Sequence, residues 1–439
     1  VRWLGGLTMW SRYLPWFVPL VSVLLLLAAC NGSSDEVVDA TVATTTTAAA
    51  TTTTVAPTTT TDAATTTTTT TQAIADGDLT AGWSSVEDSA VFGGAGRQAM
   101  RDVAASADVL VAVGAAQGDK AVDVGSADAA VWVSSDGVEW TRVGADSVFR
   151  ESAAQSMLAV IVGEPGFVAV GTAEINHQDQ PAVWLSQDGY SWDPVDDTSG
   201  AFDTHSFAQI WDVAVGGPGL VAVGYSGAPG MFDAAAWVSP DGTVWTRVTD
   251  DSFEGDHDEF MTAIAALDDG RLVVVGNDGT NRMPSVWTSS DGVSWQQIDE
   301  FGTVDEGSGM AAVAVWGDGL VAVGRDESGD DVDAAVWVSP DGNVWDRVES
   351  AAFGGPGDQV MSGVAEIDGA IIAVGYERLT DRDAVVWRSS DGLTWTRSPE
   401  GSLAASGFQE MLSLAAADDQ LVAVGYSGEI GEWDAAVWR

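Results

Sequence analysis

The sequence predicts an all-β fold, a seven-bladed β-propeller over residues 80–439 whose last blade is closed by a strand from the N-terminal side. Three observations predict it. A unit of about 50 residues repeats seven times, each unit reads as four short strands, and the two ends of the repeat region supply complementary parts of one unit. One tryptophan marks the same place in every unit, at Trp132, Trp184, Trp237, Trp287, Trp337, Trp387 and Trp438.

The first unit shows the pattern of four strands. We expect strands around residues 100–104, 109–114, 129–134 and 138–143, because these stretches are rich in small and β-branched residues and lack an apolar stripe of helical period. Asp136 and Gly137 stand between the last two stretches, and Asp-Gly is typical of a hairpin turn. Recurring methionines on the first strand, such as Met100, and recurring phenylalanines between units, such as Phe92, are expected to pack between blades.

The segment before the first unit resembles the end of a unit. Residues 81–94 resemble residues 137–150: when Trp83 is aligned with Trp140, Phe92 is aligned with Phe149. The last unit, in contrast, stops at Arg439 after its third strand. We therefore expect residues 82–87 to form the fourth strand of the seventh blade and to pair with the C-terminal strands, which would leave the ring without an open edge.

A short hairpin motif recurs in six of the seven units. Its serine, aspartate and tryptophan are Ser134, Asp136 and Trp140; Ser186, Asp188 and Trp192; Ser239, Asp241 and Trp245; Ser289, Asp291 and Trp295; Ser339, Asp341 and Trp345; and Ser389, Asp391 and Trp395. The motif resembles the Asp-box, or BNR repeat, of sialidases, the sortilin family and photosystem assembly propellers, shortened by one residue before the glycine. The resemblance implies a structural role, because Asp-boxes in that family cap a hairpin remote from the active face.

The N-terminal residues predict a targeting signal followed by a linker. An apolar run ends in Leu27-Ala28-Ala29-Cys30, which resembles the lipobox of bacterial lipoproteins. The resemblance implies a signal peptide over residues 1–29 and a lipid on Cys30, so the chain is expected on the extracytoplasmic face of the bacterial membrane. An ordinary signal peptide or anchor helix with an incidental cysteine is the alternative. Residues 30–79 are rich in Thr and Ala and predict a disordered stalk.

The amino-acid composition limits the classes of molecule that the chain can be expected to bind. Asp and Glu number 65 against 17 Lys and Arg, and a formal net charge of -48 repels nucleic acid and anionic lipid surfaces. The membrane contact is therefore expected through the lipid anchor alone. The single cysteine excludes an intramolecular disulfide. We expect a monomer that requires no cofactor.

The links between the second and third strands differ most between units, and in a propeller they share one face with the links between blades. This face is the candidate binding site, because function on a repeat scaffold lies where the repeats differ. Met231, Phe232, Met283 and Trp433 occur in these links and are candidate contacts for a protein or glycan ligand at the cell surface.

Two groups of side chains are candidate metal ligands. Asp326, Glu327, Asp330, Asp331 and Asp333 cluster in one link, and clustered carboxylates could hold Ca²⁺. A solvated acidic loop is the alternative. His205 and His257 occupy equivalent links of adjacent units, near several aspartates, and form the second candidate group.

Two functions remain open. The first is a lipid-anchored, non-catalytic propeller that binds a protein or a glycan. The alternative is a glycan-processing enzyme, a glycoside hydrolase whose acids come from the variable links. The resemblance to sialidases implies three arginines, a Tyr–Glu nucleophilic pair and an acidic Asp. Two observations argue against a sialidase. Arg101 is the only arginine expected on an inner strand, and Tyr225, Tyr376 and Tyr426 each follow the recurring second-strand glycine, which indicates a packing role.

Overall fold

The structure is a computed structural model that describes residues 82–87, 89–94, 96–117, 127–144, 149, 154–164, 166–203, 206–255, 257–279, 283–298, 307–399, 401, 403–417, 420–429 and 431–439. The chain divides into two units, Val1–Gln72 and Ala73–Arg439, and all described residues belong to the second. The predicted signal peptide, Cys30 and the predicted stalk lie outside them. In the described part of the chain, no helix is long and apolar enough to span a membrane.

Seven antiparallel sheets form the folded unit, which confirms the seven-bladed β-propeller. The strands of blades 1 to 4 are β1 (Gln98–Ala105), β2 (Leu110–Gln117), β3 (Ala127–Ser134), β4 (Trp140–Arg142); β5 (Gln155–Gly163), β6 (Gly166–Ile175), β7 (Gln178–Ser186), β8 (Asp193–Pro194); β9 (Phe207–Gly216), β10 (Gly219–Ala228), β11 (Met231–Ser239), β12 (Thr246–Arg247); and β13 (Glu259–Ala266), β14 (Leu272–Asp278), β15 (Pro284–Ser289), β16 (Trp295–Ile298).

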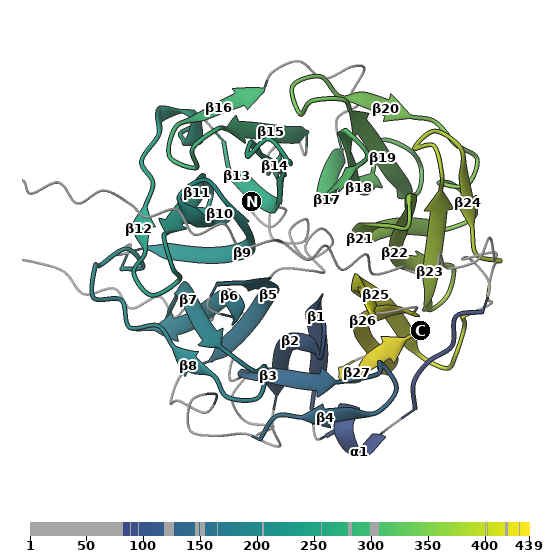
Figure 1. Cartoon of the computed structure of the whole chain (residues 1–439). Coiled ribbons are helices and arrows are strands. Elements are labelled where there is room, and N and C mark those ends of the chain that lie inside the picture. Colours follow the sequence, from purple (N-terminus) through teal and green to yellow (C-terminus); the bar gives the residue numbers. More distant parts are fainter. Residues whose placement is uncertain are drawn as a thin grey trace, which may run out of the picture. The chain divides into compact units, whose positions relative to one another are not determined.

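Blades 5 to 7 consist of β17 (Ser308–Trp316), β18 (Gly319–Asp326), β19 (Asp333–Ser339), β20 (Asp346–Val348); β21 (Asp358–Ile367), β22 (Ala370–Arg378), β23 (Arg382–Ser389), β24 (Trp395–Arg397); and β25 (Phe408–Ala417), β26 (Gln420–Glu429), β27 (Glu432–Trp438). Among the described residues, two short helices lie between blades: α1 (Ser89–Phe92) and the 3-10 helix η3 (Asp251–Phe253). The first strand of each blade adjoins the first strand of the next, and β25 adjoins β1, so seven inner strands surround the middle of the ring (Figure 1).

A glycine ends the apolar run of the second strand in every blade because the first strand approaches it closely. A Cβ on Gly114 would lie 2.0 Å from the carbonyl oxygen of Ala99, and a Cβ on Gly425 would lie 1.8 Å from that of Glu410. Opposite these glycines the register of the first strand shifts by one residue, between Met100 and Asp102 in blade 1 and between Met411 and Ser413 in blade 7. The recurring glycine therefore accommodates a β-bulge on the inner strand.

The hydrophobic core consists of seven clusters, each shared by two neighbouring blades. The cluster between blades 7 and 1 contains Met100, Trp132 and Phe92 beside Val437 of the last strand. Trp132 donates its indole N–H to the carbonyl of Val91 at 3.1 Å, so the buried indole is also hydrogen-bonded. The predicted packing of methionines and phenylalanines between blades is confirmed.

In the structure, the aspartate of each Asp-box caps its own hairpin turn. In the first box, Asp136 Oδ1 accepts the backbone N–H groups of Val138 and Glu139 at 2.9 and 2.8 Å, and Trp140 donates its indole N–H to the carbonyl of Gly137 at 3.1 Å. The other boxes repeat these contacts, and their glycines all have positive φ. Such N–H groups lower the pKa of the box aspartates, to about 2 for Asp391.

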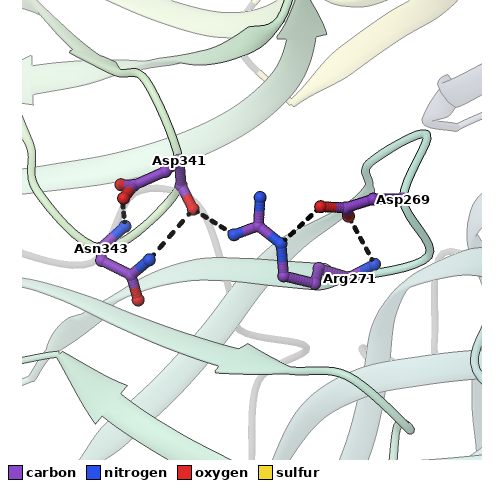
Figure 2. A network of polar contacts seen from close by, with 4 residues as sticks. All are labelled: Asp269, Arg271, Asp341 and Asn343. Atoms are coloured by element: carbon purple, nitrogen blue, oxygen red, sulfur yellow. Dashed lines mark hydrogen bonds and ion pairs between the residues drawn. The ribbon is translucent and has the colours of Figure 1, made fainter.

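Boxes also contact the preceding blade. Figure 2 shows Arg271, at the β13–β14 turn of blade 4, donating to the backbone carbonyl of Asp341 in the box of blade 5 at 2.6 Å. Asp269 holds the guanidinium from the other side at 2.8 Å, and Asn343 donates to the same carbonyl at 3.3 Å. The Asp-box turn of blade 5 therefore also joins that blade to its neighbour.

The N-terminal segment pairs with the end of the chain. Ser84 and Arg439 exchange backbone hydrogen bonds of 2.9 and 3.1 Å, and Val86 donates to the carbonyl of Val437 at 2.8 Å. Residues 82–87 form only an isolated bridge, between Ser85 and Trp438, rather than the predicted full strand. Trp83 packs against the cluster of blades 6 and 7 but is partly exposed, whereas the box tryptophans are buried. The correspondence with Trp140 is thus incomplete, because no box turn precedes Trp83.

We predict that Val86→Pro lowers the melting temperature, because proline removes the backbone N–H that Val86 donates to the carbonyl of Val437. Glu87→Pro is the matched control, since it leaves the N–H of Val86 in place. Differential scanning calorimetry distinguishes them. Equal melting temperatures for Val86→Pro and the wild type would show that this pairing adds nothing to the ring.

Candidate functional site

The blades differ most at the edge that carries the links between second and third strands, here called the variable-loop face. Three positions meet there at each junction of two blades. Two of these positions belong to the later blade of the junction: the residue before the methionine of its first strand, or before the equivalent of that methionine, and the residue after the glycine of its second strand. The third position belongs to the preceding blade and lies five residues before the tryptophan of its third strand. At the junction of blades 6 and 7 these residues are Glu410, Tyr426 and Arg382.

Glu410 lies at the centre of this junction. Its side chain is 1% exposed, Tyr426 donates its hydroxyl to Glu410 Oε2 at 2.6 Å, and Arg382 lies 3.3 Å from the same oxygen. Burial raises the pKa of Glu410 to about 8, although Arg382, Tyr426 and Arg101 oppose the shift. Arg382 also lies over the ring of Tyr376, at 4.7 Å from its centroid. The junction thus holds a buried carboxyl with a raised pKa beside a tyrosine hydroxyl and a guanidinium group.

The junction of blades 3 and 4 is aromatic instead. Phe232 and Phe260 occupy the positions of Arg382 and Glu410, Asn277 occupies that of Tyr426, and Tyr225 of blade 3 corresponds to Tyr376 of blade 6. The rings of Trp211 and Phe260 stack at 5.6 Å with an interplanar angle of 16°. Tyr225 contacts Phe232 edge-on at 4.8 Å. The four rings form one continuous aromatic cluster at the variable-loop face.

The remaining candidate contacts have different surroundings. Met231 is 72% exposed, whereas Met283 is half-buried and its carbonyl accepts the backbone N–H of Asp278 at 2.9 Å. Trp433 lies 5.3 Å from Tyr426 and under the guanidinium of Arg97, at 4.6 Å. The structure therefore places Phe232 and Trp433 in blade junctions and leaves Met231 as an open contact.

Two aspartates occur on the inner strands, at ring positions where most blades have Ala, Gly or Ser. Asp102 accepts hydrogen bonds from Val160 N–H at 2.7 Å and the Ser413 hydroxyl at 2.5 Å. Asp212 accepts those of Val213 and Ile264, both at 2.8 Å. Burial raises both pKa values, that of Asp212 to about 7. Because both oxygens of each carboxylate bind groups of the ring, these acids join neighbouring blades.

The acidic link in blade 5 adjoins a polar cavity of about 440 Å³ that Asp326, Asp333, Arg347 and Glu349 help to line. Arg347 lies 3.2 Å from Asp326, and Arg325 lies 2.9 Å from Glu327. Asp330 and Asp331 lie nearby in the link. Among the residues with described positions, no group of three or more His, Cys, Asp or Glu side chains is arranged to hold a metal ion. Calcium binding stays a prediction.

Of the two histidines in the second candidate metal group, the structure describes only His257. His257 is exposed, whereas His205 and the neighbouring Asp256 fall outside the described residues. The second candidate metal group therefore stays a prediction.

Sequence reasoning missed Glu410 and Arg382 and treated Tyr426 as a packing residue. The three come from different strands, β25, β23 and β26, and Arg382 is 28 residues from Glu410. One signal was available: the residue before the recurring methionine is uncharged in the other blades, at Ala99, Ser156, Gln209, Phe260, Gly309 and Val360.

Comparison with known proteins gives no family. No protein-family model and no curated protein matches the chain. Among solved structures, the chain is similar to a Trypanosoma rangeli sialidase mutant that displays trans-sialidase activity, with 15% identity, a TM-score of 0.46, and coverage of 81% of this chain and 58% of that chain. It is also similar to a Dyadobacter fermentans protein of unknown function, with 11% identity, a TM-score of 0.46, and coverage of 82% and 99%. The chain thus spans less than two thirds of the sialidase, and we infer neither activity nor ligand from these similarities.

We predict that Glu410→Gln flattens the pH dependence of stability. A carboxyl whose pKa is higher in the folded chain than in the unfolded chain stabilises the fold at low pH, and this stability is lost as pH rises from about 5 to about 8. The melting temperature of the wild type should therefore fall as pH rises through this window, and the melting temperature of Glu410→Gln should fall less.

Thermal melts across this pH window test the prediction, with the exposed Glu164→Gln as the matched control. The same slope in Glu410→Gln and wild type would contradict it.

Proposed function

We propose that the chain binds a protein or a glycan through its variable-loop face, without catalysing a reaction, while a lipid on Cys30 holds it on the outer side of a bacterial membrane. The observation that supports ligand binding is the aromatic cluster of Trp211, Tyr225, Phe232 and Phe260, bordered by the exposed Met231. Trp211, Phe232 and Phe260 are partly exposed, and aromatic side chains at a surface are common contacts for ligands.

The opposite face supports the same assignment by contrast. Its Asp-boxes repeat with nearly the same hydrogen bonds in six blades, and repeated turns that hold the ring together have little freedom to vary for a ligand. The variable-loop face carries different side chains at each junction: acids and amides, aromatic rings, or arginines.

A second function, glycan processing, is favoured by one contact. The Tyr426 hydroxyl is hydrogen-bonded to Glu410, and a Tyr–Glu pair is what the resemblance to sialidases implies for a nucleophile. Glu410 is sealed from solvent, however, and Asp102 and Asp212 use both oxygens to join blades. The acid of this Tyr–Glu pair thus lacks an open path to a substrate, which supports the non-catalytic function.

We predict that Met231→Ala weakens ligand binding by about threefold to tenfold, the cost of losing one exposed apolar contact at an interface. Leu393→Ala is the matched control, because Leu393 is 62% exposed on an Asp-box at the opposite face. The full chain, kept soluble in mild detergent, is tested on a glycan array and against purified surface proteins.

Binding that Met231→Ala and Leu393→Ala weaken equally would contradict a site on the variable-loop face. Turnover of fluorogenic glycosides that Tyr426→Phe abolishes would instead establish the second function.

Lipid attachment has a separate test. We predict that Cys30→Ala releases the protein from membranes or leaves an unprocessed precursor, because the thiol is the only group for the diacylglycerol. Metabolic labelling with a fatty acid, followed by membrane fractionation, measures both. Normal processing and membrane attachment of Cys30→Ala, with no label on the wild type, would remove this part of the proposal.

A further inference from the structure

The turns of the six Asp-boxes contain a dipeptide that is chemically labile. Asp followed by Gly occurs eleven times in the chain, and six of these pairs are the turns of the boxes. In such a pair the glycine nitrogen can attack Cγ of the aspartate, because glycine has no side chain to hinder the approach. The new N–Cγ bond closes a five-membered succinimide, while the N–H proton and the carboxyl hydroxyl depart as one molecule of water.

Addition of one water molecule then opens the succinimide at either of its two carbonyls. Breaking the N–Cγ bond restores aspartate, whereas breaking the original peptide bond yields isoaspartate, whose main chain runs through Cβ and Cγ. The former side-chain carbonyl is then a peptide carbonyl, and the carboxylate is attached to Cα instead. Rearrangement would therefore remove the carboxylate that caps the hairpin.

Neither residue of the dipeptide can be exchanged without loss to the fold, as the box of blade 4 shows. Asp291 Oδ1 accepts the backbone N–H groups of Val293 and Ser294 at 2.9 and 2.7 Å. Gly292 has a φ of +73°, and a Cβ on it would lie 2.9 Å from Val221 Cγ2 of the preceding blade. The hairpin thus needs a labile pair, and its durability depends on how the glycine nitrogen is held.

The box serine binds the nitrogen that would attack. In blade 4 the buried Ser289 accepts the N–H of Gly292 on its Oγ at 2.9 Å. The boxes of blades 1, 2, 3 and 5 repeat this hydrogen bond at 2.9, 2.9, 2.8 and 2.8 Å. Because the attack requires that the glycine amide turn toward Cγ of the aspartate, the bond to the serine must break before a succinimide can form.

The aspartate side of the dipeptide is restrained as well. The backbone N–H groups of Ser294 and Val293 lower the pKa of Asp291. An ionised carboxylate does not release a hydroxyl to an attacking nitrogen, so the reaction needs the protonated form, which a low pKa makes scarce at neutral pH. Hydrogen bonds of one turn therefore oppose the reaction at both of its partners.

We propose that the serine of the Asp-box protects the Asp–Gly peptide of its own hairpin from rearrangement, so that the boxes of blades 1 to 5 are latent isoaspartate sites. This role is independent of any ligand. In blade 4 the indole N–H of the buried Trp295 binds the carbonyl of Gly292 at 3.0 Å, so a rearranged turn would also displace the acceptor of a core side chain.

The test compares two variants of one hairpin in the full chain, kept in mild detergent. Ser289→Ala removes the acceptor of the Gly292 N–H, whereas the matched control Ser294→Ala removes an exposed hydroxyl that donates to Asp291 Oδ2 at 3.1 Å. After long incubation at mildly acidic and at neutral pH, digestion and electron-transfer mass spectrometry quantify isoaspartate at residue 291. The Asp269–Gly270 peptide, whose glycine N–H binds a backbone carbonyl, is the reference within each sample.

We expect Ser289→Ala to form isoaspartate at residue 291 about fivefold to tenfold faster than the wild type, the factor by which loss of one hydrogen bond changes an equilibrium. Ser294→Ala should stay near the wild-type rate, and the reference peptide should be unchanged in both variants. Ser239→Ala repeats the comparison in blade 3, where the glycine N–H lies 2.8 Å from the serine.

Hydrogen exchange separates protection of the dipeptide from a general opening of the turn. The amides of Val293 and Ser294 bind Asp291, so they should keep their wild-type exchange rates in Ser289→Ala if the cap stays in place. Equal isoaspartate formation in Ser289→Ala and the wild type would overturn the proposal. A faster reaction that accompanies unfolded-like exchange at both amides would also overturn it, because the serine would then only hold the turn closed.

Discussion

Burial of apolar side chains between neighbouring sheets is the interaction on which the whole ring depends. Each blade has two apolar faces and covers neither by itself, so each of the seven core clusters needs residues of two blades. A blade at an open end would expose one face, and the chain has no intramolecular disulfide to compensate. Contact between β25 and β1, and the hydrogen bonds of residues 84–86 with residues 437–439, complete the last junction.

The same constraint explains which sequence positions are alike from blade to blade and which positions differ. Positions that face a junction core are similar in all blades, and those of the Asp-box are similar in six, because the junctions repeat one geometry. The positions at the variable-loop edge face a mixed environment and differ. One junction has a buried Arg382–Glu410 pair, another has four aromatic rings, and Arg97 covers Trp433 at a third.

Sequence reasoning predicted what the repeats share. The period, the four strands, the Asp-boxes and the wedge phenylalanines could be found because seven copies average out local ambiguity. It did not predict Tyr426 beside Glu410 and Arg382, because a contact found at one junction leaves no repeated signal. It also overstated Trp83, which matches Trp140 in spacing yet lacks a box turn to cover it. The rings of Trp211 and Phe260 were missed because their stacking joins two blades through one bulge position.

Hydrogen exchange at the seam tests the closed ring most directly. The amides of Val86 and Arg439 donate to Val437 and Ser84, so in the closed ring they exchange only when the seam opens. Measured on the intact chain, these two amides should be protected to about the same degree as the fourth strands of the other blades. Exchange at the rate of an unfolded peptide, while β25 and β26 stay protected, would contradict closure by the N-terminal segment.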